Sequence, residues 1–220
     1  MPSEDGTGSG ADPGLVLGFD TSAAQCAAAL VSGDRVLAAR REAMDRGQAE
    51  RLLPMLQEVL AKAGAGWGDL AALAVCTGPG NFTGIRVGVA AARGLALGLG
   101  VPAIGVTAFE AHSHAAPARR TFALLAQGRW YGQTAEAGEG VDAPAELGTA
   151  PPGSGAPEAV ALTGLVRPGP VDPAHVALLA AARLATGSAH AAARPLPFYL
   201  RAADAAPSSE PPPRLLDDDT

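Results

Sequence analysis

Residues 70–106 read LAALAVCTGPGNFTGIRVGVAAARGLALGLGVPAIGV, and this stretch does most to decide the fold. It opens with a short apolar run at 71–76, which is typical of a buried strand. A glycine-rich turn at 78–84 follows, then a long apolar helix that ends near Leu99, then a second apolar run at 101–106. Strand, turn, helix and strand in this order predict an α/β fold.

Upstream of this unit the chain predicts three strands and a helix. Apolar runs at 15–20, 25–32 and 35–41 indicate a three-stranded meander, with Gly33-Asp34 as a tight hairpin turn between the last two. A helix is expected over 48–63, where apolar residues recur at helical spacing. The first half therefore has the order strand, strand, strand, helix, strand, helix, strand.

The second half repeats this theme more loosely. The expected elements are a hairpin at 121–126 and 129–137, a loop or weak edge at 138–157, a short strand at 160–163, a helix at 173–186 capped by Asp172, and an extended return at 195–201. Two halves that both open with a meander suggest a duplicated domain. The actin-like fold is built in this way, although a doubly wound fold is the obvious alternative.

The negative charge of the chain resides in its ends. The net charge is −6, but the first 13 residues carry three acids, and the stretch from Asp204 carries five acids and one arginine. The body from Gly14 to Ala203 is therefore close to +1, which argues against a large nucleic-acid footprint. We expect disordered tails at 1–14 and 204–220, a first lobe at 15–108, a smaller lobe at 109–194 and a return segment at 195–203.

Cysteine usage and hydropathy favour a cytoplasmic protein. Cys26 and Cys76 each fall in a predicted buried strand, where reduced core thiols are expected. Arg86 and Arg93 interrupt the longest apolar run, so no membrane span is predicted, and the acidic N-terminus has no signal-peptide pattern. The densest group of basic residues is best interpreted as a solvated strand end and helix start, and it comprises Arg40, Arg41, Arg46 and Arg51.

The turn at 78–84 joins a strand to a helix N-terminus, which is a common place to hold an anion. Its glycine spacing is one residue too long for a dinucleotide fingerprint, and it lacks the Gly-Lys-Ser/Thr of a P-loop. A tight turn with close helix packing is therefore favoured over a phosphate site. Asp20, at the end of the first strand, is a second candidate for positioning a metal and phosphate, or is simply a polar strand end.

The helix at 81–99 contains more glycine than an isolated helix tolerates. Gly84, Gly88, Gly94 and Gly98 together cost roughly 3–4 kcal/mol relative to alanine, which close packing must offset. The helix is also apolar around most of its circumference, which indicates burial on two sides. One side can be its own sheet, and the other needs a second element. With helix 48–63 it could form a two-helix docking surface.

Metal and hydrolase chemistry are disfavoured. Glu110, His112 and His114 follow the strand at 101–106, but histidines two residues apart on a helix point about 200° apart. No third histidine or cysteine lies near them in the sequence. The motifs of serine hydrolases and zinc proteases do not occur, so a protease is not supported.

Six motifs occur in an order that closely resembles the TsaB (YeaZ) family. They are LGFDTS at 17–22, ERLLP at 50–54, TGPGNFTGIR at 77–86, GLAL at 94–97, GVTAFEA at 105–111 and PFYLR at 197–201. The resemblance covers residues 15–111 well and is thin across 112–194. The chain departs from the family at Gln48, where a histidine is common.

The resemblance implies an actin-like (ASKHA, RNase H-like), two-lobed α/β fold and a non-catalytic role without a cofactor. The family member pairs with the catalytic paralogue TsaD through the first two helices of each chain, and the small ATPase TsaE joins them. The complex transfers a threonylcarbamoyl group onto N6 of adenosine 37 in tRNAs that read codons starting with A. This subunit would meet tRNA only through the complex, and it could form a homodimer when alone.

The same resemblance places a partner interface on helices 48–63 and 81–99. The residues assigned to it are Leu52, Leu53, Leu56, Val59, Leu60, Ile85, Gly88, Val89, Ala92 and Leu99. The metal-binding histidine pair of the catalytic paralogue falls at Ala108 and His112, so one ligand is missing and no metal site is expected. The competing hypothesis is an actin-like, ATP-dependent phosphotransferase that uses Asp20 and the turn at 78–84.

Overall fold

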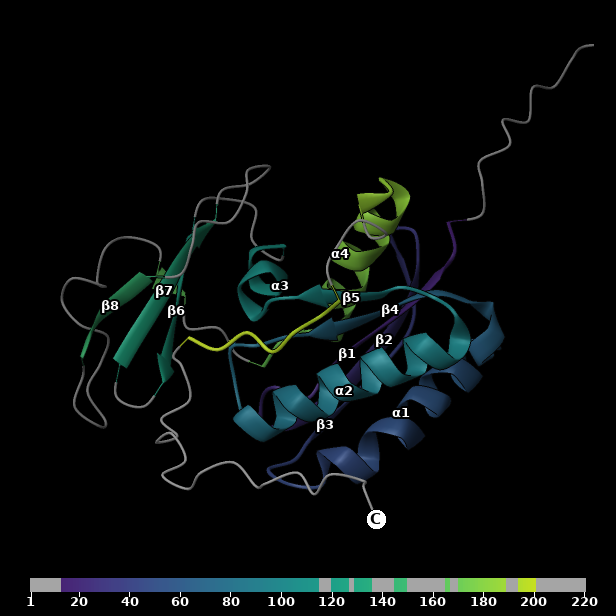
Figure 1. Cartoon of the computed structure of the whole chain (residues 1–220), viewed down its shortest axis with the longest axis horizontal. Coiled ribbons are helices and arrows are strands. Elements are labelled where there is room, and N and C mark those ends of the chain that lie inside the picture. Colours follow the sequence, from purple (N-terminus) through teal and green to yellow (C-terminus); the bar gives the residue numbers. More distant parts are fainter. Residues whose placement is uncertain are drawn as a thin grey trace, which may run out of the picture.

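The computed structural model contains two β-sheets and four α-helices among the residues it describes (Figure 1). Those residues are 13–114, 120–126, 129–135, 145–149, 165–166, 170–188 and 194–200. The tails expected at 1–14 and 204–220 lie outside them, apart from Pro13 and Gly14, as do most of 138–157 and the strand expected at 160–163.

The first sheet is mixed and has the strand order β3-β2-β1-β4-β5. Strand β1 (Leu15–Asp20) pairs antiparallel with β2 (Gln25–Ser32), which pairs antiparallel with β3 (Arg35–Ala43). On its other side β1 runs parallel to β4 (Leu70–Cys76), and β4 runs parallel to β5 (Ala103–Val106). All five strands were expected from the sequence, with ends that differ by one or two residues.

Helices cover both faces of this sheet. Helix α1 (Gln48–Lys62) and helix α2 (Phe82–Leu99) lie together on one face, and helix α4 (Pro173–Ala185) lies on the other (Figure 1). Alternate residues of β1 pack into the two hydrophobic cores, one on each face of the sheet. Leu17 and Phe19 pack towards α1 and α2, whereas Val16 packs towards α4. This alternation follows from the period of two along a strand.

Helix α4 corrects the expected division of the chain into lobes. We assigned it to the smaller lobe at 109–194, but its residues Val176, Ala177 and Ala180 pack with β1 and β4 in the core of the first sheet. A side chain at Gly18 on β1 would come within 2.7 Å of the backbone N of Ala177. Helix α4 thus completes the first lobe, because its apolar face packs on the side of that sheet opposite α1 and α2.

The second sheet has the order β8-β7-β6-β9. The expected hairpin is confirmed as β6 (Arg120–Ala126) and β7 (Arg129–Ala135), and the weak edge within 138–157 contains β8 (Ala145–Thr149). Strand β9 (Leu165–Val166) runs parallel to β6. The short helix α3 (Ala108–His114) precedes this sheet, and a 3-10 turn (Trp67–Asp69) precedes β4.

Candidate functional site

The glycine-rich turn packs directly against the turn that follows β1. A methyl group at Gly80 would overlap the carbonyl oxygen of Ser22, and one at Gly84 would overlap that of Thr21. The backbone N–H of Asn81 donates to the Ser22 carbonyl at 2.6 Å. These glycines therefore allow two backbones to meet, which is the close-packing interpretation of the motif.

Part of the hydrogen-bonding capacity at the start of α2 is already used. The Asn81 side-chain oxygen accepts from the backbone N–H groups of Thr83 and Gly84, each at 3.0 Å. The Thr21 hydroxyl donates to the Gly84 carbonyl at 2.7 Å. Asn81 is thus an N-cap of ordinary geometry, and the backbone N–H groups of Asn81, Thr83 and Gly84 are bonded within the chain.

Asp20 is sealed inside the protein. Its side chain has 0% exposure and accepts hydrogen bonds from the Ser22 backbone N–H at 2.9 Å and from the Gln25 amide at 2.6 Å. The same amide nitrogen of Gln25 donates to the Val171 carbonyl at 2.8 Å. Through Gln25, Asp20 therefore ties β1 to the segment that enters α4, and its side chain is not exposed to solvent.

Glu110 has a structural role. With Thr107 it forms a capping box at the start of α3, in which the Thr107 N–H donates to Glu110 at 2.7 Å and the Glu110 N–H donates to the Thr107 hydroxyl at 3.1 Å. Arg183 of α4 pairs with the same carboxylate and donates to the Gly105 carbonyl at 2.7 Å. This network fixes α3 and α4 against the end of β5.

The histidines on α3 do not assemble a metal site in the described part of the chain. His114 meets His175 of α4 edge to face, with ring centroids 5.1 Å apart, and burial together with His175 lowers the pKa of His114. The described residues contain no group of three or more metal-ligating side chains. Position 108, where the catalytic paralogue has one of its two metal-binding histidines, is a buried alanine.

The two cysteines are buried on opposite faces of the first sheet. Cys26 belongs to the core beneath α1 and α2, and Cys76 to the core beneath α4. Burial raises the pKa of the Cys26 thiol from 9.0 to about 11, and burial raises that of Cys76 as well. Both are free thiols, as expected from the sequence.

Most of the residues assigned to the partner interface are core residues of this chain. Eight of the ten are buried, and they are Leu52, Leu56, Val59, Leu60, Ile85, Gly88, Val89 and Ala92. Their assignment to a surface is corrected, because the strongest apolar stripe of each helix is the one that its own sheet covers. Leu53 keeps 47% exposure and Leu99 is half-buried.

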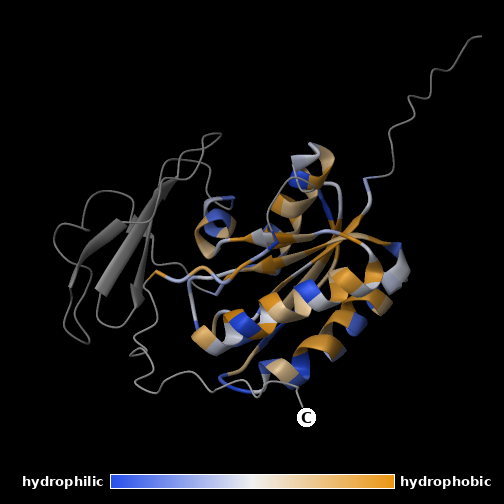
Figure 2. Cartoon of the chain, viewed as in Figure 1, coloured by the Kyte–Doolittle hydropathy of each residue, from blue (hydrophilic) through white to orange (hydrophobic). Residues whose placement is uncertain are grey.

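A different set of apolar and small residues forms the outward side of the two helices. Leu97 is 81% exposed. We call the following residues the docking face, and all are exposed: Leu53 and Ala61 of α1, and Ala90, Gly94, Leu97 and Gly98 of α2. A methyl group at Gly94 or Gly98 would meet nothing within 4 Å. Apolar residues continue along the visible side of both helices (Figure 2).

Helix α2 is long and apolar enough to cross a membrane by length and composition, yet only 33% of it is buried. Its buried side packs on the sheet as a core helix does, and its exposed side carries Arg86 and Arg93. Gly94 and Gly98 have open space around them, so close packing within the described part of the chain does not explain why these positions are glycine. The cost of Gly94 and Gly98 is therefore not offset by any contact among the described residues.

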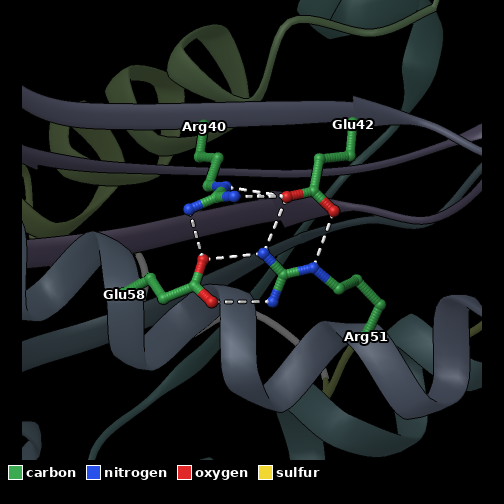
Figure 3. Close-up of polar contacts among 4 residues, drawn as sticks. All are labelled: Arg40, Glu42, Arg51 and Glu58. Atoms are coloured by element: carbon green, nitrogen blue, oxygen red, sulfur yellow. Dashed lines mark hydrogen bonds and ion pairs between the residues drawn. The ribbon is translucent and has the colours of Figure 1, made fainter.

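The basic residues beside α1 are neutralised by acids. Arg51 donates to Glu42 at 2.6 Å and to Glu58 at 2.7 Å, while Arg40 bridges the same two carboxylates (Figure 3). This four-residue network joins α1 to β3. It confirms the interpretation of these arginines as a solvated strand end and helix start.

An aromatic clasp holds Arg86 near the start of α2. The guanidinium lies 3.7 Å from the Phe82 ring centroid, and its Nε–H donates to the Tyr199 hydroxyl at 2.8 Å. The Phe82 and Tyr199 rings stack with centroids 5.2 Å apart. The return segment that carries Tyr199 is itself anchored, because the Phe198 N–H donates to the Thr77 carbonyl at 2.8 Å.

Comparisons with known proteins agree with the six sequence motifs. The family model described as TsaD, tRNA N6-adenosine threonylcarbamoyltransferase, matches residues 41–196. The Escherichia coli tRNA threonylcarbamoyladenosine biosynthesis protein TsaB is 38% identical over 115 residues, which is 52% of this chain and 44% of that protein. The Haemophilus influenzae protein of the same name is 40% identical over 102 residues, 46% of this chain and 42% of that protein.

A solved structure extends the likeness to most of the chain. The crystal structure of an uncharacterized Pseudomonas aeruginosa protein with similarity to peptidase YeaZ superposes with a TM-score of 0.70 at 26% identity, covering 86% of this chain and all of that one. The chain belongs to the TsaB (YeaZ) family. An uncharacterized Mycobacterium tuberculosis protein, 36% identical over 205 residues, covers 87% of this chain and 94% of its own length.

The fold expected for a TsaB-family member, an actin-like α/β fold, is confirmed. This chain spans less than half the length of the E. coli and H. influenzae TsaB proteins that it matches. The structure also explains why the family motifs lie where they do. The motif at 17–22 meets the motif at 77–86 through the hydrogen bond between Ser22 and Asn81. The motif at 197–201 contacts the motif at 77–86 through the hydrogen bond between Tyr199 and Arg86.

Sequence reasoning missed two functional arrangements. The Arg86 clasp joins residues 113 positions apart, and the docking face contains, besides Leu53 and Leu97, alanines and glycines that no apolar-stripe count selects. For the clasp, a usable signal was present, since Phe82, Arg86 and Tyr199 all belong to quoted motifs. For the docking face, the signal was the unexplained cost of Gly94 and Gly98.

Proposed function

We propose that this chain is a non-catalytic, cytoplasmic subunit in the biosynthesis of tRNA threonylcarbamoyladenosine, and that it works by binding a TsaD-type catalytic subunit. The observation that carries the proposal is the docking face. Its exposed leucines and uncovered glycines suit close contact with two helices of another chain. A TsaE-type ATPase joins the pair, and tRNA is met only through the assembled complex.

The non-catalytic role is supported by the state of the two places where chemistry was expected. Asp20 is buried and hydrogen-bonded, and the backbone N–H groups of Asn81, Thr83 and Gly84 are bonded within the chain. A phosphotransferase of this fold needs these groups free to meet a nucleotide. The matching TsaD-type family supplies the catalytic partner in this proposal.

Size-exclusion chromatography of this chain co-expressed with the TsaD-type subunit of the same organism tests the pairing. We expect one peak at the mass of the heterodimer at micromolar concentration, and a homodimer when the partner is omitted. Two separate peaks for the co-expressed pair contradict the proposal.

Calorimetry with ATP and Mg²⁺ tests the non-catalytic assignment independently. The isolated chain is expected to bind the nucleotide weakly or not at all, because its phosphate-facing groups are occupied. Low-micromolar binding would instead favour the actin-like phosphotransferase.

A further inference from the structure

The exposed stripe of α2 carries positive charge that nothing in the described chain neutralises. Arg86, Ala90, Arg93 and Leu97 are all exposed, and their spacing of four, three and four residues places them on one side of the helix. Helix α2 contains no acidic residue. Neither arginine has an ion-pair partner among the residues that the structure describes.

The contrast with α1 makes this arrangement informative. In the network beside α1, Arg40 and Arg51 share the carboxylates of Glu42 and Glu58. These two arginines are therefore neutralised within the chain, whereas Arg86 and Arg93 have no carboxylate among the described residues. The unpaired ones lie on the stripe that also holds the most exposed leucine, Leu97.

Arg86 is also held ready for a ligand. Phe82 supports one face of its guanidinium and Tyr199 takes its Nε–H, so the side chain has already lost much of its rotational freedom. Its two terminal nitrogens have no acceptor among the described residues. A guanidinium with both terminal nitrogens free presents two parallel N–H donors, and a carboxylate fits them with two hydrogen bonds.

We infer that Arg86 is a specificity-determining residue of the docking face, and that it receives a carboxylate of the TsaD-type subunit. This inference rests on the proposed function. A protein carboxylate fits better than a nucleic-acid phosphate, because Ala90, Gly94 and Leu97 along the same helix offer apolar contact, and Arg40 and Arg51 beside α1 are already paired with carboxylates. Arg93, two turns further on, extends the same charge complementarity.

The test measures the affinity of the full-length chain for the TsaD-type subunit by calorimetry, at low and high salt. Arg86→Gln is expected to weaken binding about tenfold or more, and Arg86→Lys several-fold because a lysine cannot form the fork. Tyr199→Phe keeps the ring and removes only the hydroxyl, and it is expected to weaken binding by a smaller factor. Arg35→Gln is the matched control, because Arg35 is exposed on edge strand β3, away from α2.

Charge exchange identifies the carboxylate. Arg86→Glu is expected to lose binding, and replacement of one acidic residue on the partner's docking helices by arginine is expected to restore it. If the wild-type chain binds but Arg86→Gln binds equally well, this inference is overturned while the proposed function stands. If Arg86→Gln weakens only tRNA binding by the assembled complex, the inference is likewise overturned. Failure of the wild-type chain to bind overturns both.

Discussion

Four glycines interrupt α2, and their surroundings divide them into two pairs. Gly84 and Gly88 touch Thr21 of the neighbouring turn, where a methyl group at Gly88 would lie 2.7 Å from the Thr21 hydroxyl oxygen. Gly94 and Gly98 face open space. The first pair serves the fold of this chain. Gly94 and Gly98 lower the stability of the helix, and no contact among the described residues compensates for this until another surface covers them.

This division predicts opposite effects of the same substitution. Gly84→Ala is expected to lower the free energy of unfolding by about 1–3 kcal/mol, because the methyl group overlaps a backbone carbonyl that cannot move freely. Gly94→Ala is expected to raise it by up to about 1 kcal/mol through helix propensity. Urea unfolding of the two full-length variants measures both. Equal effects, or a destabilised Gly94→Ala, would show that the two sites do not differ as described.

Cys26 provides a second prediction for a single residue. Its pKa is raised to about 11 by burial, so the thiol stays protonated and should resist alkylation in the folded chain at pH 8. Because the pKa of the Cys26 thiol is higher in the folded chain than in the unfolded one, the buried neutral thiol contributes to the stability of the folded state. This contribution is fully present below about pH 9 and is lost as the pH rises towards 11. Iodoacetamide labelling with and without urea measures the protection. Rapid labelling of Cys26 without urea contradicts it.

At the scale of elements, α1 is fastened to edge strand β3 by the network of Arg40, Glu42, Arg51 and Glu58 (Figure 3). Hydrogen bonds from Arg51 and Arg40 hold the pKa of Glu42 at about 2, down from 4.5. A lowered carboxyl pKa contributes stability above pH 4.5, and this contribution is lost as the pH falls towards 2. At near-neutral pH, this network therefore holds helix α1 in place against β3.

Glu42→Gln tests this attachment. The variant is expected to have a lower melting temperature than the wild type at pH 7, and the difference should shrink as the pH falls from 4.5 to about 2. Glu50→Gln is a suitable control, since Glu50 is exposed on the first turn of α1 and makes no ion pair within the described residues. A pH-independent difference would assign the effect to something other than the charge.

The elements that sequence reasoning found are those that local patterns determine. Helices α1 and α2 followed from apolar spacing, and Asp172 caps α4 as the sequence predicts. The packing of α4 on the first sheet depends on contacts between distant segments, which no local pattern records. The interface assignment was wrong for Leu56 and Val89 for a related reason. Periodicity finds the stripe that will be buried but does not tell which surface buries it.

Across the whole molecule, contacts between distant segments hold α4 and the return segment against the first sheet, whereas α1 and α2 on its other face present an exposed outward side. Arg183 and Gln25 tie α4 to the far face of the first sheet, and the return segment anchors the end of β4 through Phe198. Helices α1 and α2 lie on the other face of this sheet (Figure 1), and their outward side carries the exposed residues of the docking face.

The affinity of the chain for the TsaD-type subunit, measured with the docking face altered, tests this account most directly. The double variant Leu53→Asp and Leu97→Asp places two carboxylates on that face, and Val36→Asp, at an exposed valine on β3, is its control. We predict that the double variant stays folded but loses the heterodimer, whereas Val36→Asp keeps it. A double variant that binds its partner as tightly as the wild-type chain would contradict the central claim.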